Sequence, residues 1–423
     1  MKKTTLYPFP PLKWILAALL LSALNAPAVS ASPSGENTSL TSQWQQQIFE
    51  RQPDKAVIEA YDRLARSSRE AAGNVLGNMA LTLRHESDAL TDDQGVRTWE
   101  GGIDLPLKVF DQRAAYDDLA RRYPSLRDAH ERWLRWQSAG IARALLSDLQ
   151  ERRIRAKNAE DAETQASRLH DLVTLRERTG DASQLDLLLA RRHLAQAQAL
   201  TVSARADLAR TVETVALWGI DLNEADLDRL AADAAEVQAV SEEMEQRIHD
   251  HPRYRWLAAR NDVERARLEL ALWQDRPSSE LYLGTINDRA SGSPSDTALV
   301  IELRLPLGAN PGYQSAAAQG AQQQRQLDAD LARLALQLRQ GIVEAQQSLT
   351  KARQLLPLSR QQLEAAEKAF ALSRRAYDAG DIGLQDLLIV QQQQLQARLE
   401  YALAEANVAR KTRQLNQANG VFQ

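Results

Sequence analysis

The chain has 423 residues and a net charge of −4, so its charge argues against a nucleic-acid-binding surface. It contains no cysteine, which excludes disulfide bridges and cysteine ligands for a metal. The sequence also lacks a nucleophile–base set, a phosphate-binding glycine loop and a cofactor motif, so we expect neither an enzyme nor a bound cofactor.

The N-terminal segment has the features of an export signal. A basic start precedes an apolar run from Trp14 to Leu24, and Val29-Ser30-Ala31 has the small-residue pattern of a signal-peptidase site. The apolar run is about half the ~20 residues that a spanning helix needs, so an uncleaved membrane anchor is the less favoured alternative. We therefore assign residues 1–31 to a signal peptide and expect the mature chain to begin near Ser32.

A helical pattern over residues 43–72 gives way to a period of two. In residues 77–108, apolar and polar side chains alternate on both sides of a polar turn, which predicts a β-hairpin with two strands of about ten residues. The pattern returns in residues 279–308. Such strands fit a half-buried sheet in a soluble domain or an outer-membrane β-barrel, and the export signal and long helices favour the barrel. On the polar face we expect four pore-lining side chains, namely Glu100, Asp104, Glu302 and Arg304.

Each β-hairpin is followed by a long helix and a return helix. Helix-forming residues dominate residues 111–178 and 314–378, and at ~1.5 Å per residue each helix would reach on the order of 100 Å. The return helices are expected at residues 184–219 and 384–418. Both helical hairpins should therefore project well beyond a membrane.

The two halves of the chain are related by an offset of 200 residues, which indicates a tandem duplication. Gly180 and Asp181 match Gly380 and Asp381, and Leu105-Pro106-Leu107 matches Leu305-Pro306-Leu307. At both tips a glycine ends one helix and an acidic residue lies near the start of the next, which predicts a helical hairpin. We divide the chain into repeat 1 (residues 32–220), an acidic insertion (residues 221–241) and repeat 2 (residues 242–423).

Some features break the symmetry of the repeats. Pro124 and Pro357 have no proline counterpart, and each should kink or break its long helix. The insertion should carry a small amphipathic helix that includes Leu227 and Val237, and should form an equatorial collar together with the chain termini.

Four strands are too few to close a membrane barrel, because the smallest transmembrane barrels use about eight. The protein must therefore oligomerise if it forms one. Two chains would supply eight strands and three would supply twelve, and the periodicity alone leaves both open.

These features together resemble the TolC family of trimeric outer-membrane efflux ducts. The resemblance is carried by the two tips, by the Leu-Pro-Leu strand ends and by His251-Pro252-Arg253-Tyr254, and it covers essentially the whole mature chain. The compact length is similar to that of the CzcC-type metal-efflux subgroup. The resemblance implies an α+β membrane protein: a long-helix α-barrel, built of helical hairpins, continuous with a trimeric 12-stranded transmembrane β-barrel that takes four strands from each chain. It also implies a location in the bacterial outer membrane with a long periplasmic extension.

The resemblance further implies partners and sites. A periplasmic adaptor protein would link the homotrimer to an inner-membrane pump of the RND or ABC type, by contacting the tips at Gly180, Asp181, Gly380 and Asp381. A periplasmic gate would use Asp186, Tyr377 and Asp386. The sequence departs from the family at Ile382, where a basic residue is expected, and at Leu189 or Ile389, where a second acidic ring is expected.

The cargo would be small molecules or metal ions, but two other functions stay open. One is the outer-membrane component of a type I protein-secretion system, which would keep the fold. The other is a soluble periplasmic coiled-coil scaffold with an ordinary small sheet. His249 and His251 are two residues apart, a spacing that points them to different sides of a helix, so we expect no metal site there.

Overall fold

The structure is a computed structural model that describes residues 40–88, 90, 95–108, 110–223, 226, 236–274, 279–289, 294–306 and 311–422. The signal peptide assigned to residues 1–31 lies outside the described residues.

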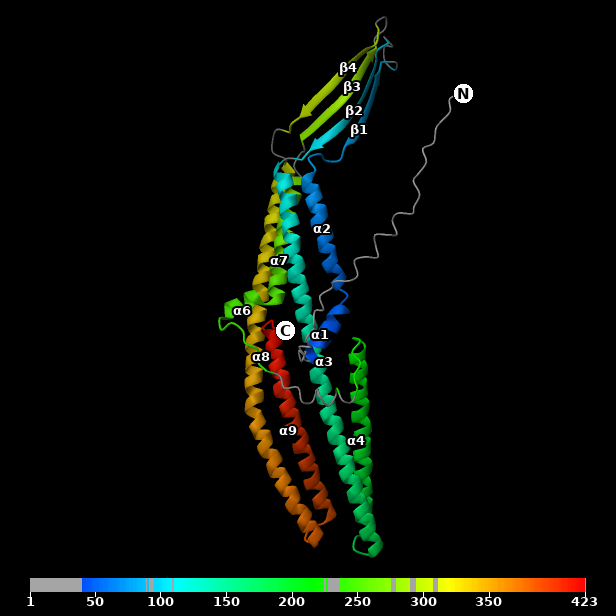
Figure 1. Cartoon of the computed structure of the whole chain (residues 1–423), viewed down its shortest axis with the longest axis vertical. Helices are drawn as coiled ribbons and strands as arrows, with labels where there is room; N and C mark the ends of the chain where they lie inside the picture. Colours follow the sequence, from blue (N-terminus) through cyan, green and yellow to red (C-terminus); the bar gives the residue numbers. More distant parts are fainter. Residues whose placement is uncertain are drawn as a thin grey trace, which may run out of the picture. The chain divides into compact units, whose positions relative to one another are not determined.

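The secondary-structure elements follow one another in the same order in both repeats (Figure 1). In repeat 1 they are α1 (Leu40–Glu50), α2 (Lys55–Gly73), β1 (Ala80–Ser87), β2 (Arg97–Leu107), α3 (Phe110–Thr179) and α4 (Gln184–Ala216). In repeat 2 they are α6 (Met244–Asp250), α7 (Pro252–Gln274), β3 (Ser279–Arg289), β4 (Asp296–Arg304), α8 (Pro311–Ala379) and α9 (Leu384–Ala418).

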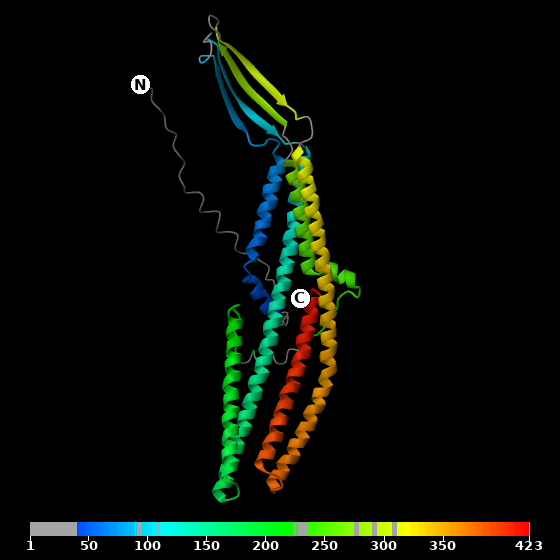
Figure 2. The same cartoon turned by 180° about the vertical axis from the view of Figure 1, so that it is seen from behind.

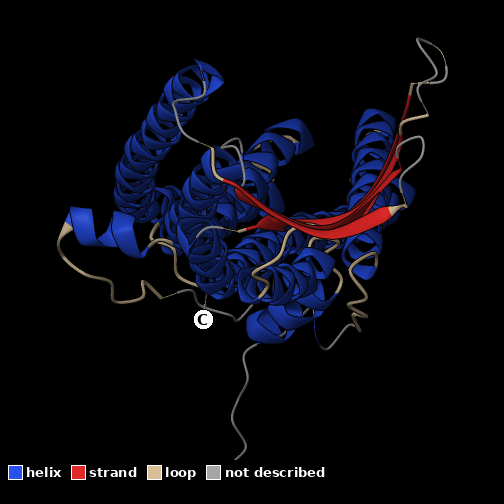
Figure 3. Cartoon of the chain, turned by 90° about the horizontal axis from the view of Figure 1, so that it is seen from above, coloured by secondary structure: helices blue, strands red, loops and turns tan. Residues whose placement is uncertain are grey.

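The four strands form one antiparallel sheet in the order β1-β2-β3-β4. Its central pair joins the two repeats, because Ile103 of β2 lies opposite Leu283 of β3. Seen along the helices, the sheet is an arc rather than a flat layer (Figure 3). Strands β1 and β4 are its edges, and neither has a second strand partner among the described residues.

The helices form a layer that is four helices wide (Figures 1 and 2). Near the sheet, α3 packs against α2 and α7, and α7 packs against α8. In the other half, α3 packs against α4 and α9, and α9 packs against α8. The order of helices across the layer is therefore α2, α3, α7, α8 near the sheet and α4, α3, α9, α8 in the tip half. In the tip half α4 and α8 are the outer helices.

Three buried clusters hold this layer together. One joins α1, α3 and α4 around Ile48, Leu146 and Val215. Another joins α2, α3 and α7 around Tyr123 and Val263. The third lies at the tips and joins both hairpins around Val173, Ala190, Leu384 and Leu387. Burial of apolar area in these clusters holds α3 near the sheet, in its middle and at the tip, and the third cluster joins the two repeats.

The single helix expected at residues 43–72 is wrong. The segment forms two helices, α1 and α2, separated by residues 51–54. Pro53 accounts for the break, because it lacks the N–H that would continue the α-helical ladder. The next helix then begins at Lys55.

The two mid-helix prolines behave differently from Pro53. Pro124 and Pro357 lie inside α3 and α8, and neither ends its helix. Each long helix keeps its other backbone hydrogen bonds and packs against neighbouring helices, and together these outweigh the one hydrogen bond that a proline removes. The break that the sequence suggested as an alternative to a kink is therefore absent.

The return helix of repeat 1 ends at Ala216, earlier than the expected residue 219, and Gly219 has a φ of 75°. Most of the expected insertion helix, including Leu227, lies outside the described residues. Val237 lies in an irregular segment, so the helix does not extend that far. This segment packs on the end of α9, where Asn416 Nδ2 donates to the Glu236 carbonyl at 2.8 Å.

Within the described part of the chain, no helix is both long enough and apolar enough to cross a membrane.

Candidate functional site

The sheet has two chemically different faces. The register pairs Asp104 with Tyr282 and Tyr282 with Glu302, whereas the neighbouring row pairs Ile103 with Leu283 and Leu283 with Ile301. Because side chains alternate between faces along a strand, the central part of each strand contributes mainly polar residues to one face and mainly apolar residues to the other. The four residues expected to line a pore, Glu100, Asp104, Glu302 and Arg304, share the polar face.

Charges on the polar face are partly neutralised by one another. Arg304 forms ion pairs with Glu280 and Glu302, each at 3.2 Å, and Arg84 lies 4.0 Å from Glu100. Asp104 accepts a hydrogen bond from the hydroxyl of Thr82. The face is therefore polar and mixed in sign.

Tyr282 fills a gap on the same face. A Cβ added at Gly102 would lie 2.5 Å from Tyr282 Cζ, and one added at Gly284 would lie 2.5 Å from the Tyr282 hydroxyl oxygen. The two glycines therefore make room for the ring to lie flat along the sheet, which is the role an aromatic side chain plays over strand glycines.

The apolar face is uncovered. Leu81 is 73% exposed, Leu299 is 72% exposed and Leu303 is 55% exposed, and no described segment packs over them. The other exposed large side chains on this face are Leu83, Trp99, Ile103, Leu283 and Ile301. A continuous apolar surface of this size is rare on a monomer and indicates contact with a partner or a membrane.

The two tips end their first helices in the same way. Gly180 and Gly380 both have a φ of 85°, a left-handed conformation that glycine adopts without strain. At the first tip the N–H of Asp181 donates to the Arg176 carbonyl at 2.7 Å, and at the second the N–H of Asp381 donates to the Ala376 carbonyl at 2.9 Å. This backbone motif satisfies the last carbonyls of α3 and α8.

The two carboxylates after the tips have different partners. Asp186 closes a capping box: Asp186 Oδ2 accepts from the Ser183 N–H at 3.1 Å and from the Ser183 hydroxyl at 2.7 Å, and the Asp186 N–H donates to Ser183 Oγ at 3.1 Å. At the second tip the equivalent first residue is Gly383, which has no side chain to cap α9. Among the described residues, Asp386 forms no side-chain hydrogen bond or ion pair.

One contact joins the two hairpins near the tips. Arg176 Nη2 donates to Asp378 Oδ1 at 3.4 Å, and the Arg176 guanidinium carbon lies 5.1 Å from the centre of the Tyr377 ring. Tyr377 was expected at a gate, and the structure places it in this contact. Asp186 and Asp386 have no described contact with it.

Arg176 and Asp378 were not among the site residues expected from the sequence. The available signal was a basic residue one helical turn before Gly180, and its counterpart at the same position in repeat 2 is Ala376. Because the two tips otherwise match, this difference indicates a contact in which only the first tip supplies the hydrogen-bond donor.

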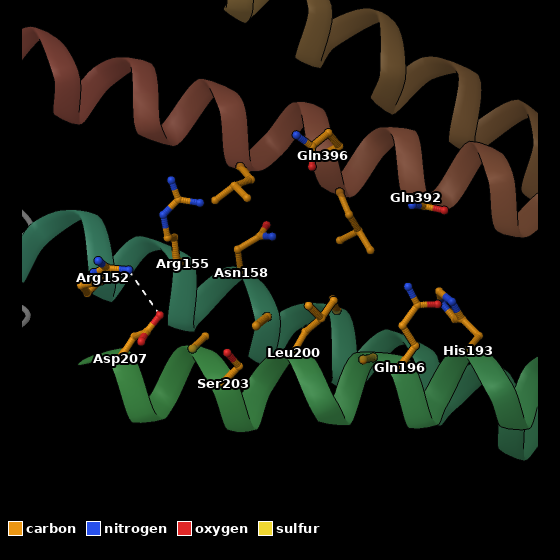
Figure 4. A pocket seen from close by; sticks show the side chains of 16 residues that line it. Arg152, Arg155, Asn158, His193, Gln196, Leu200, Ser203, Asp207, Gln392 and Gln396 are labelled. Atoms are coloured by element: carbon orange, nitrogen blue, oxygen red, sulfur yellow. Dashed lines mark hydrogen bonds and ion pairs between the residues drawn. The ribbon is translucent and has the colours of Figure 1, made fainter. Parts of the chain in front are cut away.

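A cavity of about 410 Å³ lies between α3, α4 and α9 (Figure 4). Its cations are already paired: Arg152 lies 3.3 Å from Asp207, and Arg155 lies 2.9 Å from Glu151. Burial and the neighbouring Arg192 lower the pKa of His193, so its imidazole is neutral at pH 7. The cavity therefore offers amide and imidazole hydrogen bonds rather than unpaired charge.

The two histidines considered above for a metal lie apart from the tips. His249 is exposed in α6, and His251 is buried just before α7. Among the described residues, no group of three or more His, Cys, Asp or Glu side chains is arranged to hold a metal ion.

Neither the models of known protein families nor the sequences of curated proteins match this chain. Solved structures do. CusC, described in work on transmembrane channel formation, is 12% identical with a TM-score of 0.70, over 90% of this chain and 92% of that one. The outer membrane protein VceC from Vibrio cholerae is 12% identical with a TM-score of 0.67, over 90% and 97%.

The outer-membrane channel OprN is 18% identical with a TM-score of 0.67, over 90% of this chain and 89% of that one. The chain therefore has the fold of these channels, and the resemblance to the TolC family is confirmed at the level of the fold. The matches do not single out the CzcC-type subgroup, which stays a prediction.

Proposed function

We propose that three copies of this chain form an exit duct in the bacterial outer membrane, and that the duct carries small molecules or metal ions from an inner-membrane pump. The observation that supports this proposal most directly is the sheet, which has a continuous exposed apolar face and a polar face on its other side. The solved structures with this fold include proteins described as outer-membrane channels. Because these proteins are only 12–18% identical to this chain, they support the proposal through the fold alone.

The sheet supports a closed barrel made from several copies. An open edge in lipid would leave the N–H and C=O groups of β1 and β4 without partners, which costs several kcal/mol for each group. Pairing β4 of one copy with β1 of the next removes both edges. With three copies this gives twelve strands, with the apolar face toward lipid and Glu100, Asp104, Glu302 and Arg304 toward the pore.

The helical layer supports the same assembly. Each outer helix of the tip half carries a stripe of exposed apolar residues at successive spacings of three, seven, four and three positions. On α4 the stripe is Leu185, Leu188, Ala195, Ala199, Val202, Ala206 and Ala209, and on α8 it is Leu355, Leu358, Ala365, Ala369 and Leu372. This is the spacing of a coiled-coil seam, so α4 of one copy would pack on α8 of the next and close a twelve-helix tunnel.

At the far end, we assign the tip residues Gly180, Asp181, Gly380 and Asp381 to contact with a periplasmic adaptor protein. The helical hairpins present them beyond the rest of the layer (Figure 2). The adaptor would couple the duct to a pump of the RND or ABC type, which supplies the energy. The duct itself would catalyse no reaction, because its contribution is a closed wall, a gate and a docking surface.

For the gate, we propose that Tyr377 acts together with Arg176 and Asp378, whose contact holds the two hairpins of one chain together. Asp386 forms no side-chain hydrogen bond or ion pair with the described residues, so three copies of it would be available to face a narrowed tunnel and attract cations. Asp186 is engaged in its capping box, so its proposed part in the gate is structural.

The test uses two substitutions three residues apart on β4. Leu303→Arg places a charge on the apolar face and should lower barrel stability by ~2–4 kcal/mol if the residue lies near the bilayer midplane. Val300→Arg is the matched control, because Val300 points to the polar face. The measurement is the yield of heat-sensitive trimer extracted from outer membranes with mild detergent.

We expect Leu303→Arg to abolish the trimer and Val300→Arg to preserve it. Equal tolerance of the two substitutions would contradict the barrel and favour a soluble periplasmic scaffold.

A further inference from the structure

A second cavity, of about 420 Å³, lies between the two hairpins a few helical turns from the tips. It is lined by three helices, α3, α8 and α9, so it touches both repeats. The residues that matter for its chemistry are Arg168, Phe370, Arg374, Tyr377, Gln391 and Gln394.

Its floor contains two unsatisfied amide oxygens. Gln391 is 4% exposed and Gln394 is 6% exposed, and the Oε1 atom of each is buried without a hydrogen-bond donor among the residues that the structure describes. Gln391 is held in place by its other atom, because its Nε2 donates to Gln165 Oε1 at 3.2 Å. A buried acceptor without a donor is unfavourable, so the floor is chemically complete only when an occupant donates to it.

Its rim carries excess positive charge. Arg398 lies 3.9 Å from Glu367, and Asp378 is paired with Arg176, so these two charges are largely accounted for. Neither Arg168 nor Arg374 forms an ion pair with any residue that the structure describes. Two guanidinium groups therefore face the opening with their donors available to an anion.

Its walls are apolar and rigid. Leu169, Phe370, Tyr377 and Leu387 line the cavity and also belong to the buried cluster that joins the hairpins at the tips. A flat apolar group would replace water against these side chains, and their packing fixes the distance between floor and rim.

We propose that this cavity binds a small organic anion that combines a negatively charged group, a flat apolar ring and a hydrogen-bond donor. The anionic group contacts Arg168 and Arg374. The ring packs against Phe370 and Tyr377, and the donor reaches the oxygens of Gln391 and Gln394. A hydrated metal ion does not fit this site, because Asp378, the carboxylate in its lining, is paired with Arg176, whereas Arg168 and Arg374 are cationic.

The site stays accessible in the proposed trimer. At 3.6 residues per turn, Arg374 lies about 200° around α8 from Leu372, which belongs to the seam stripe. The cavity therefore faces away from the neighbouring copy. Since an occupant touches α3 as well as α8 and α9, it would reinforce the contact between Arg176 and Asp378 and hold the proposed gate closed. This consequence rests on the proposed function, whereas the binding itself does not.

The experiment measures binding of three probes to the purified full chain by calorimetry. The probes are 4-aminobenzoate, benzoate and 4-aminobenzamide, of which benzoate lacks the donor and the benzamide lacks the charge. We expect 4-aminobenzoate to bind about tenfold more tightly than either of the others, because each loses one set of hydrogen bonds.

Matched variants separate the site from general charge effects. Arg374→Gln should weaken 4-aminobenzoate about tenfold, whereas Arg375→Gln makes the same charge change one residue away, outside the cavity lining, and should change nothing. Gln394→Leu should remove the advantage of 4-aminobenzoate over benzoate while preserving the fold, because an apolar side chain replaces an unsatisfied amide.

Equal binding of all three probes, or equal loss in the Arg374 and Arg375 variants, would overturn the site. Conductance of the reconstituted protein provides the second readout, and we expect 4-aminobenzoate to lower it. Binding without any effect on conductance would keep the site and overturn its link to the gate. A protein that binds 4-aminobenzoate but forms no channel would overturn the proposed function and leave the site in place.

Discussion

The two hairpin tips end their first helices with the same backbone and begin their second helices with different side chains. Gly180 and Gly380 have the same φ and the same hydrogen-bond pattern. Ser183 then caps α4 through Asp186, whereas Gly383 leaves α9 without a side-chain cap. The two tips thus share the backbone geometry that a hairpin needs, whereas only one of the two matching carboxylates has a hydrogen-bonding partner among the described residues.

The far ends of the return helices likewise share their backbone conformation and differ in the side chains around it. Gly219 and Gly420 both have positive φ, of 75° and 78°. A Cβ on Gly219 would clash with the guanidinium of Arg51, whereas a Cβ on Gly420 would lie 2.7 Å from Pro252 Cδ and 3.0 Å from His251 Cδ2. One joint is therefore closed by an arginine and the other by a buried histidine, so protonation of that histidine would act on the second joint.

The largest difference between the two joints should appear on acidification. His251 is 1% exposed, and its Nδ1 accepts the N–H of Arg253 at 3.1 Å, which caps the start of α7. Burial, with Arg253 nearby, lowers the pKa of His251 to about 4. In the unfolded chain His251 is protonated below pH ~6.5, whereas in the folded chain it is protonated only below about pH 4. Stability therefore falls as the pH falls through this window.

Between pH 7 and pH 5 this linkage amounts to about 2 kcal/mol in the free energy of unfolding, which urea titration followed by circular dichroism would measure. His251→Asn keeps an acceptor for the Arg253 N–H but cannot titrate, so it should flatten the pH dependence by that amount. His249→Asn, in the exposed position two residues earlier, should leave it unchanged. A slope as steep in His251→Asn as in the unchanged protein would contradict the assignment to this joint, whereas a smaller remaining slope is expected, because burial also lowers the pKa values of His130 and His193.

The tips should differ by a smaller amount. Asp186→Ala removes two hydrogen bonds to Ser183, whereas Asp386→Ala removes only a charge at the start of α9. We expect the first substitution to cost about 1 kcal/mol more than the second. Hydrogen exchange of the first turn of each return helix would report this as roughly fivefold faster exchange for Asp186→Ala. Equal acceleration at both tips would show that the capping box contributes nothing.

The sequence predicted the repeated parts of the fold because they rest on local signals. The glycines at 180 and 380, the apolar alternation in the strands and the long helical patterns each act within a few residues, and the helices and strands appear where these signals lie. The polar face of the sheet was also predictable, since Glu100, Asp104, Glu302 and Arg304 follow from a period of two.

The contacts between repeats were not predictable in the same way. Arg176 and Asp378 are about two hundred positions apart, and neither residue alone differs from an ordinary surface charge near a helix end. The same holds for Gln391 and Gln394, which read as polar residues in a glutamine-rich helix and are buried only because α3 and α8 flank α9. Pro53 is the opposite case, because this local signal for a helix break determines the structure although the residues on both sides continue a helical pattern.

The substitution with the smallest expected effect tests the difference between the tips most directly, because it gives the second tip the capping residue of the first. Gly383 has φ −78° and ψ 163°, close to the −81° and 157° of Ser183, so serine fits there without strain. Gly383→Ser should bring its hydroxyl to the Asp386 N–H and its own N–H to the Asp386 carboxylate, which completes a second capping box worth about 0.5 kcal/mol.

Slower hydrogen exchange at the start of α9, by roughly twofold, would confirm the new cap. Gly383→Ala is the control, since it adds the Cβ without the hydroxyl and should not slow exchange. If Asp386 attracts cations in the assembled duct because it has no local partner, Gly383→Ser should also reduce cation selectivity in planar bilayers, although the charge itself is unchanged. If the cap forms and cation selectivity stays the same, hydrogen bonding of Asp386 has no effect on the pore. The difference between the two tips would then have no role in selectivity.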